Sequence, residues 1–391
     1  MSTIAPGDAR ALTRALVEID SRNPSLVPGA PGEGPVARAL AEVLRSWGFA
    51  AEVADAAPNR PNVVARVGRA GGRTLMFNGH LDVVGTDGMT HEPFAATERD
   101  GSIWGRGSSD MKGGVAAMCA AAARAAATGL DCEIIITAVA DEEYGSIGTR
   151  ALIDRGVRAD AAIVTEPTRL AIAPAHRGFV WITVTVRGRA AHGSRYDVGI
   201  DAIRHAGLLL VELDALESSE LVHRTHPLLG HASWHASTID GGSGMSTYPD
   251  RCTLRIERRT LPGETPAQAV EEVCDACARV RATHPSFDAV VALDLAQNPS
   301  DVAVDAPVVR RLGRALASIG EPARVEGLSA WTDAALLNEA DIPAICFGPG
   351  DIARAHAAVE WIEIDEIERA TRVLTTLAGA WTRDEDPVWR T

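Results

Sequence analysis

The chain has 391 residues, 46% of them hydrophobic, which is enough for a large buried core and for two domains. Its formal net charge of -14 argues against nucleic acid or an anionic membrane surface as the main partner. The first 20 residues carry charged side chains of both signs and no uninterrupted apolar run, so we expect no secretory signal. The most apolar stretch, residues 113–123, is too short to span a bilayer, so we expect no membrane segment and a cytoplasmic location.

Helix and strand patterns alternate from the start of the chain to about Arg177. Apolar residues at helical or strand spacing predict, in chain order, helices over 8–19 and 36–47, strands over 62–67 and 74–77, a helix over 113–128, and strands over 133–139 and 161–165. Near-continuous apolar strands that alternate with helices are typical of a mainly parallel sheet covered on both faces. The pattern therefore predicts an α/β core.

The pattern changes after Gly178. The next predicted elements are a strand over 179–186, a helix over 199–216, strands over 235–240 and 252–257, a helix that begins near Thr265, and a strand over 289–295. Thr265 and Gln268 have the spacing of a capping box, with proline between them at the first helical position. The order β-α-β-β-α-β predicts a ferredoxin-like α+β domain.

Alternation resumes at about Gln297, with helices predicted over 308–319 and 364–380 and a strand over 344–347. His356 thus belongs to the same pattern as the first part of the chain. We predict one discontinuous catalytic domain, residues 1–177 and 296–391, into which residues 178–295 are inserted as a second domain.

A histidine and a carboxylate lie two residues apart where the apolar run 74–77 ends. These residues are His80 and Asp82. A histidine that binds a metal usually donates its other ring nitrogen to a carboxylate, and Asp82 is placed to fix the orientation of His80 in this way. Taken alone, the pair is more typical of a surface turn.

Further polar residues follow other apolar runs in the same manner. They are Asp110, Glu142, Glu143, Glu166 and His356. Residues at the carboxyl ends of parallel strands converge at one edge of an open α/β sheet, although they are far apart in sequence. The sequence therefore predicts that these side chains form one site.

The candidate ligands offer nitrogen and oxygen but no sulfur, which suits zinc, cobalt or manganese better than calcium or magnesium. Two ions that share one carboxylate could polarise a carbonyl and acidify a shared water. Of Glu142 and Glu143, one would bind metal and the other would handle protons. The alternative is that Asp141, Glu142 and Glu143 are only an acidic helix start.

Other sites are less well supported. Ser108, Ser109 and Ser194 do not lie in the G-x-S-x-G pattern of serine hydrolases. Cys274 and Cys277 form a CxxC within a predicted helix, where we expect two small buried residues. A polar stretch with four histidines could be a second metal site, but a solvated loop is favoured; these are His223, His226, His231 and His235.

The assembled motifs resemble the M20 metallopeptidase and deacylase family, the group of acetylornithine deacetylase, succinyl-diaminopimelate desuccinylase, aminoacylase and glutamate carboxypeptidase. The resemblance covers nearly the whole chain and rests on Gly79-His80-Leu81-Asp82-Val83-Val84, Trp104-Gly105-Arg106-Gly107 through Asp110-Met111-Lys112-Gly113-Gly114, Asp141-Glu142-Glu143, Thr165-Glu166-Pro167-Thr168, Gly188-Arg189-Ala190-Ala191-His192-Gly193-Ser194 and Arg259-Thr260-Leu261-Pro262-Gly263-Glu264.

The resemblance implies a role for each residue of the predicted site. Asp110 would bridge two zinc-like ions, with His80 and Glu166 completing one site and Glu143 and His356 the other. Glu142 would be the general acid and base, and Asp82 would orient His80.

The resemblance also makes residues 178–295 a lid and dimerisation domain. His192 of this domain would help to stabilise the oxyanion, often across a homodimer interface, and Arg259 would receive a substrate carboxylate. Ser246 stands where relatives commonly have an asparagine, which puts substrate specificity in question more than catalysis.

We therefore predict a dinuclear-metal amidohydrolase that removes an acyl group from an N-acylated amino acid. Two divalent ions are expected, with zinc favoured over cobalt or manganese. The alternatives are a dipeptidase or carboxypeptidase of the same family, with a short peptide as substrate, or a catalytically silent relative that binds metal or an amino acid.

Overall fold

The computed structural model describes residues 4–381, which divide into two compact units. The first unit comprises residues 4–174, 302–326 and 332–381, and the second comprises 175–301 and 327–331. Each unit has its own cluster of buried hydrophobic side chains. Within the described residues, no helix is both long enough and apolar enough to cross a membrane. The cytoplasmic location stays a prediction.

The first unit is built on a mixed sheet with a parallel centre. Its strands run in the order β1-β2-β6-β3-β7-β17-β8. Strands β6, β3, β7 and β17 pair in parallel, and the strands on either side of them pair antiparallel. The strand bounds are β1 Ala50–Ala57, β2 Arg60–Gly68, β3 Thr74–His80, β6 Glu133–Val139, β7 Ala161–Val164, β8 Ile172–His176 and β17 Ala344–Cys346.

The register of the parallel strands brings their carboxyl ends to one edge of the sheet. His80, the last residue of β3, lies opposite Val139, the last residue of β6. On the other side of β3, Asn78 lies opposite Val164, where β7 ends. Residues that follow these strands therefore emerge close together, as the position of each motif after an apolar run predicts.

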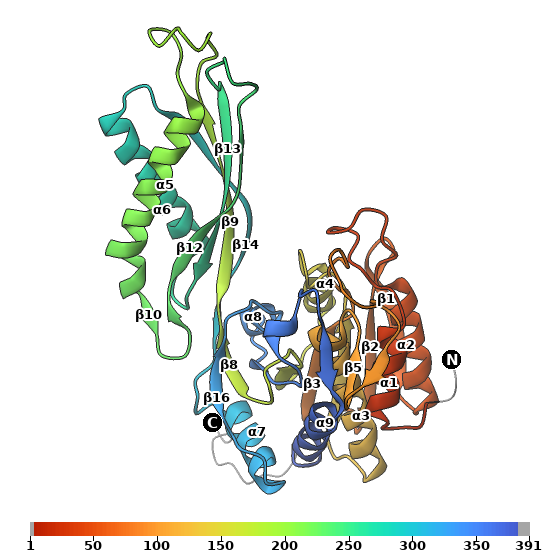
Figure 1. The fold of residues 1–391 in the computed structure, drawn as a ribbon. Helices are drawn as coiled ribbons and strands as arrows, with labels where there is room; N and C mark the ends of the chain where they lie inside the picture. The colour runs from red at the N-terminus through yellow and green to blue at the C-terminus, as the bar shows by residue number, and fades with distance from the viewer. Residues whose placement is uncertain (1–3, 382–391) are drawn as a thin grey trace. The chain divides into compact units, whose positions relative to one another are not determined.

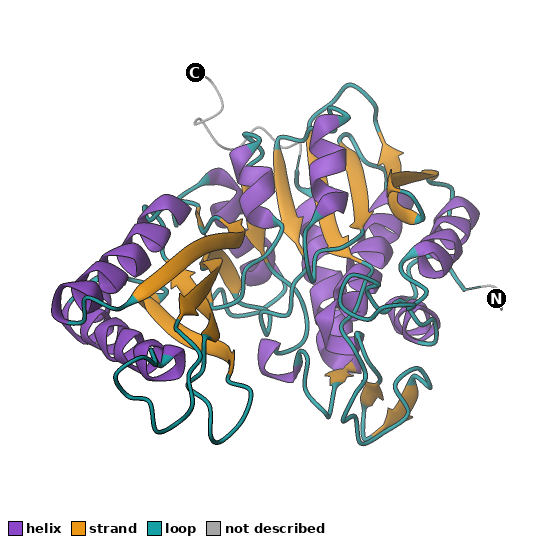
Figure 2. Ribbon diagram, turned by 90° about the horizontal axis from the view of Figure 1, so that it is seen from above, coloured by secondary structure: helices purple, strands orange, loops and turns teal. Residues whose placement is uncertain are grey.

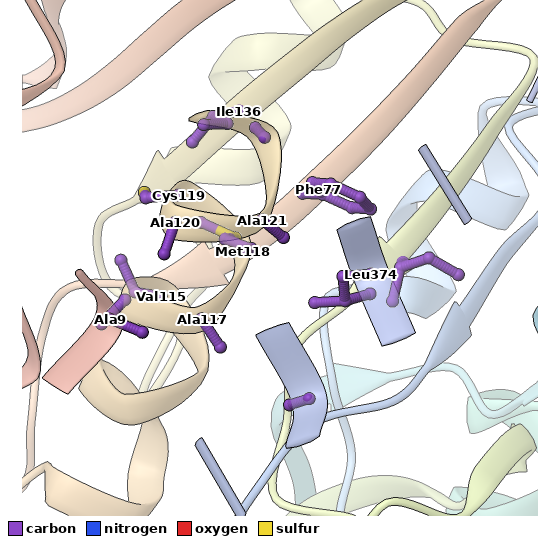
Figure 3. Close-up of a cluster of buried hydrophobic side chains, with 14 of the residues drawn as sticks. Ala9, Phe77, Val115, Ala117, Met118, Cys119, Ala120, Ala121, Ile136 and Leu374 are labelled. Carbon is purple, nitrogen blue, oxygen red and sulfur yellow. The ribbon is translucent and has the colours of Figure 1, made fainter. Parts of the chain in front are cut away.

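Helices cover both faces of this sheet, as Figure 2 shows. Side chains alternate between the faces along each strand. Phe77 and Ile136 point toward the buried, alanine-rich helix α3, which also packs against α1 and α9 (Figure 3). Ile135 lies on the opposite face with Leu152 of α4. The helix bounds are α1 Ala9–Val17, α2 Gly34–Ser46, α3 Gly113–Ala127, α4 Ile147–Asp154, α7 Pro307–Ser318, α8 Ala334–Glu339 and α9 Ile364–Gly379.

The second unit is a four-stranded antiparallel sheet with two helices on one face, coloured green to teal in Figure 1. The strand order β12-β13-β9-β14 is that of a ferredoxin-like fold. The bounds are β9 Gly178–Arg187, α5 Ala202–Ser219, β12 Ser233–Gly241, β13 Arg251–Thr260, α6 Pro266–Thr283 and β14 Asp288–Gln297.

The start of α6 has the predicted capping box, in which the Thr265 hydroxyl accepts from the Gln268 N–H and the Gln268 side chain accepts from the Thr265 N–H. The expectation that both cysteines of the CxxC are buried is wrong for Cys274, which is exposed, whereas Cys277 is buried. The buried residues of α6 are Ala269, Val273, Ala276, Cys277 and Val280, and Cys274 lies outside this buried stripe.

Short elements connect the main ones. β18, β5 and β4 form a small antiparallel sheet, and β10 pairs with β11. Their bounds are β4 Thr97–Arg99, β5 Ser102–Trp104, β10 Thr225–His226, β11 Gly230–His231, β15 Ser300–Asp301, β16 Val325–Leu328 and β18 Trp361–Glu363, with short helical turns η1 Ser108–Lys112, η2 Leu221–His223 and η3 Ile352–Arg354.

The predicted fold class is confirmed: an α/β unit with a mixed sheet, and a separate antiparallel α+β sheet. The prediction omitted β1, whose sequence is rich in alanine and acidic residues rather than in β-branched ones. The role of residues 178–295 as a lid and dimerisation domain stays a prediction.

Candidate metal centre

Three buried side chains form the first group of possible metal ligands. They come from the end of β3, from η1 and from the segment after β7: His80, Asp110 and Glu166. One ligand atom of each lies within 4.8 Å of the others. His80 Nε2 is 3.0 Å from Asp110 Oδ1 and 4.0 Å from Glu166 Oε1. One ion could contact all three atoms after small side-chain adjustments.

A second group shares Asp110 with the first and adds Glu143 and His356. His356 Nε2 lies 2.8 Å from Glu143 Oε2 and 3.6 Å from Asp110 Oδ2. The two oxygens of Asp110 therefore face different histidines, which is the arrangement of a carboxylate that bridges two ions. The groups differ in exposure, because the His356 side chain is 56% exposed and that of His80 is 1% exposed.

The ring of His80 is oriented by the main chain of Asp82. His80 Nδ1 lies 2.9 Å from the Asp82 carbonyl oxygen and 3.8 Å from the carboxylate. With Nδ1 donating to this carbonyl, Nε2 is the nitrogen left to bind a metal ion. The Asp82 carboxylate instead accepts from the main-chain N–H groups of Glu142 and Glu143, at 3.2 Å each.

Glu142 and Glu143 lie in a turn between β6 and α4 and not on a continuing strand or at the start of a helix. The turn begins at Asp141, which has a φ of 67°. It directs the two side chains to different places. Glu143 faces His356, whereas Glu142 Oε2 lies 3.9 Å from His80 Nε2 and belongs to neither ligand group.

The electrostatics of the site are dominated by buried carboxylates. Burial, together with the neighbouring Glu166, raises the pKa of Glu142 well above its usual range. Burial and Asp110 do the same to the pKa of Glu166. A hydrogen bond with Glu143 raises the pKa of His356 to about 9. The cluster therefore favours a positive charge among its carboxylates.

The donor set fits divalent transition metals. Imidazole nitrogen and carboxylate oxygen are the ligands that zinc, cobalt and manganese accept. Glu166 Oε1 is buried and has no hydrogen-bond partner in the described part of the chain, although it faces both His80 and Asp110. A buried acceptor normally has a partner, so an oxygen of this kind suits a cation as its ligand.

Two residues outside the predicted set support the site from behind. Asn23 Nδ2 donates to Asp82 Oδ2 at 2.8 Å and to Asp141 Oδ1 at 3.0 Å. Arg60 donates to Asp141 Oδ1 and Asn23 Oδ1 and pairs with Glu33. This network joins the loop before α2 to the turn that carries Glu142 and Glu143. Asn23 precedes a proline in a polar loop, and nothing in that local pattern distinguishes it from an ordinary turn residue.

The Peptidase family M20/M25/M40 matches residues 76–380 of the chain. The chain belongs to this family. It is 32% identical over 345 residues to an acetylornithine deacetylase from Myxococcus xanthus, covering 85% of this chain and 88% of that protein.

The fold is similar to those of several solved structures. A tripeptidase from Staphylococcus aureus has a TM-score of 0.81 at 19% identity, over 98% of this chain and 100% of that one. A dinuclear metal-binding peptidase of the M20 family from Bacillus subtilis has a TM-score of 0.72 at 17% identity, over 96% and 97%. This M20 protein is therefore a metal-dependent hydrolase that acts on C–N bonds.

The other predicted residues of this M20 chain lie in the second unit. His192 and Ser246 lie in adjoining exposed segments, joined by a hydrogen bond of 2.7 Å from the Gly193 N–H to the Ser246 carbonyl. Arg259 is elsewhere, on β13, and donates to Glu257 and to the Ser329 carbonyl. Within the described residues, the histidines at 223, 226, 231 and 235 are in neither ligand group.

Proposed function

We propose that this M20 hydrolase removes an acyl group from an N-acylated amino acid by attack of water on the amide. The observation that carries the chemistry is the pair of ligand groups that share Asp110, with a further buried carboxylate, Glu142, beside them and in neither group. The acetylornithine deacetylase at 32% identity supports a deacylase over a peptidase.

In this proposal, His80, Asp110 and Glu166 hold one divalent ion, and Asp110, Glu143 and His356 hold the other. Zinc is the ion we favour, with cobalt or manganese as alternatives. When bound, two such ions would polarise the substrate carbonyl and acidify the attacking water.

Glu142 is the proposed general base and then general acid. It would accept a proton from the attacking water and deliver it to the leaving nitrogen, because its carboxylate lies next to the ligand atoms without being committed to either group. Asp82 would position both His80 and Glu142. The Asp82 carbonyl holds the His80 ring, and the Asp82 carboxylate accepts from the Glu142 N–H.

His192, Arg259 and Ser246 are the proposed substrate-binding residues, and a homodimer formed through the second unit is part of the same proposal. Arg259 suits a substrate carboxylate because its guanidinium is a planar fork of donors. Its present partners, Glu257 and the Ser329 carbonyl, would compete with that carboxylate. Light scattering would test the dimer, and a fully active monomer would contradict a role for His192 across an interface.

A substrate screen tests the proposal directly. The metal-loaded protein would be incubated with N-acetyl, N-succinyl and N-carbamoyl amino acids and with a few dipeptides, and the released amine would be measured. We expect the highest kcat/KM with an N-acyl amino acid.

Faster turnover of dipeptides would establish the alternative, a dipeptidase or carboxypeptidase, which the similar fold of the tripeptidase favours. Absence of turnover with every substrate, together with stoichiometric metal binding, would leave the catalytically silent relative.

A further inference from the structure

A buried ion pair lies directly behind the shared ligand Asp110. Arg106 Nη1 donates to Glu360 Oε2 at 2.6 Å, and the two side chains are 3% and 1% exposed. They are 254 residues apart in sequence: Arg106 lies between β5 and η1, and Glu360 lies just before β18. Neither residue offers an atom to the two ligand groups.

Glu360 fixes the main chain at Asp110. Its Oε1 accepts from the N–H of Ser109 at 3.0 Å and from the N–H of Asp110 at 3.1 Å. One carboxylate oxygen thus holds two successive peptide groups, one of them that of the ligand itself. The direction in which the Asp110 side chain leaves the backbone is set by this contact.

Arg106 also contacts the loop that follows Asp82 and the loop that carries His356. Its Nε donates to the Gly85 carbonyl at 3.0 Å, in the loop that follows Asp82. Its Nη2 donates to the Ala357 carbonyl at 3.2 Å, and Ala357 is the residue after His356. The guanidinium uses its three nitrogens on three residues in two segments, Gly85 in one and Ala357 and Glu360 in the other, which no other side chain can do with the same geometry.

The His356 segment depends most on these contacts. His80 and Glu166 follow strands in the middle of the sheet and are buried, whereas His356 lies in a loop, has a φ of 60° and is more than half exposed. The contact of Arg106 with Ala357 and the position of Glu360, four residues after His356, tie that loop to Asp110.

We propose that Arg106 and Glu360 are positioning residues that hold the Asp110 and His356 segments at the spacing needed to share an ion. The proposal rests on the assignment of the two ligand groups made above. The group formed by Asp110, Glu143 and His356 should need the pair more than the group formed by His80, Asp110 and Glu166 does.

Arg106→Lys tests this inference, because lysine keeps the charge but replaces the three-way fork with one point donor. The metal-free full-length chain would be titrated with Co²⁺ by calorimetry, without substrate. We expect two ions to bind the unaltered chain. In the variant, one should bind within about threefold of its original affinity and the other about 10- to 100-fold more weakly, the range typical of residues that support metal ligands.

Glu360→Gln is the second variant. The amide oxygen can still accept from Ser109 and Asp110, but its NH₂ group cannot accept from Arg106, so we expect the same selective loss. Two ions bound with unchanged affinities in both variants would overturn the inference, and so would an equal loss of both ions. Failure of the unaltered chain to bind two ions would instead overturn the proposed function.

Arg258→Lys is the matched control. Arg258 is equally buried and donates to Glu264 at 2.6 Å and to Glu272 at 3.0 Å, but it lies in the second unit. Its replacement should lower the melting temperature of the metal-free chain and leave both Co²⁺ affinities unchanged. A drop in Co²⁺ affinity in this control would show that loss of any buried arginine pair weakens the metal groups.

Discussion

Two clusters of buried charge, one in each unit, are compensated in opposite ways. In the first unit, Asp110, Glu142 and Glu166 are buried around His80, so acidic groups outnumber basic ones. In the second unit, Arg258 is buried between Glu264 and Glu272, and hydrogen bonds join it to both.

The difference shows which cluster needs a partner from outside the chain. Buried charges are tolerated when opposite charges and hydrogen bonds compensate them, as they do around Arg258. Like charges brought together in a buried site raise one another's pKa and favour either protons or a bound cation. Function is therefore expected where the chain leaves its buried charge uncompensated, and structure where it compensates it.

The largest expected effect is on catalysis in the first unit. Glu142→Gln keeps the size of the side chain but removes the proton acceptor. We expect kcat to fall by about 10²- to 10⁴-fold, the usual contribution of a general base. Bound metal, measured by elemental analysis, should be unchanged, because Glu142 belongs to neither ligand group. Undiminished turnover would contradict the mechanism.

Metal removal should lower the stability of the first unit and leave that of the second unchanged. An ion present at 100 times its Kd stabilises the folded state by about 2.7 kcal/mol, so chelation should lower the stability of the first unit by about that amount per ion. Hydrogen exchange should therefore accelerate at β3 and β6 and stay the same at β9 and β13. Equal acceleration in both units would mean that they unfold together and would weaken the comparison.

The position of the site could be predicted because it depends on which residues stand at the ends of apolar strands in the sequence. His80 and Glu166 follow apolar strands, and parallel pairing of β3 with β7 brings the ends of those strands together. The alternation of apolar and polar residues likewise sufficed for the ferredoxin-like unit, since one face of its sheet is covered by helices.

The supporting contacts could not be predicted, because they join segments with no common pattern. Asn23 contacts Asp82, and Arg60 contacts Asn23, only after the chain has folded, and each is typical of an exposed loop or strand end in sequence. The atom of Asp82 that orients His80 could not be predicted either, because the sequence specifies a residue but not whether its carbonyl or its carboxylate makes the contact.

A smaller effect is expected from the pH dependence of the second unit. Burial lowers the pKa of His176 to about 4, so the ring is neutral when folded. The unfolded ring has a pKa near 6.5 and takes up a proton first as the pH falls. The unfolded state then binds more protons, and about 2 kcal/mol of stability should be lost between pH 7 and pH 5.

His176→Phe would isolate this contribution, because phenylalanine keeps an aromatic ring against Trp331 but does not titrate. Urea unfolding at a series of pH values should show a shallower loss of stability in the variant than in the unaltered chain. Parallel curves for the two proteins would mean that the acid sensitivity comes from other groups.

The smallest effect tests whether stability and metal binding are independent. Thr265→Ala removes the hydroxyl that accepts from the Gln268 N–H at the start of α6, and losing such a cap costs about 1 kcal/mol. Urea unfolding should show this loss, whereas Co²⁺ affinity and kcat should match those of the unaltered chain, because the cap lies in the second unit, which contributes no residue to either ligand group. Serine at this position keeps a hydroxyl and should restore most of the stability. A change in Co²⁺ affinity in Thr265→Ala would show that the second unit influences the metal groups, and the separation between the two units would then have to be abandoned.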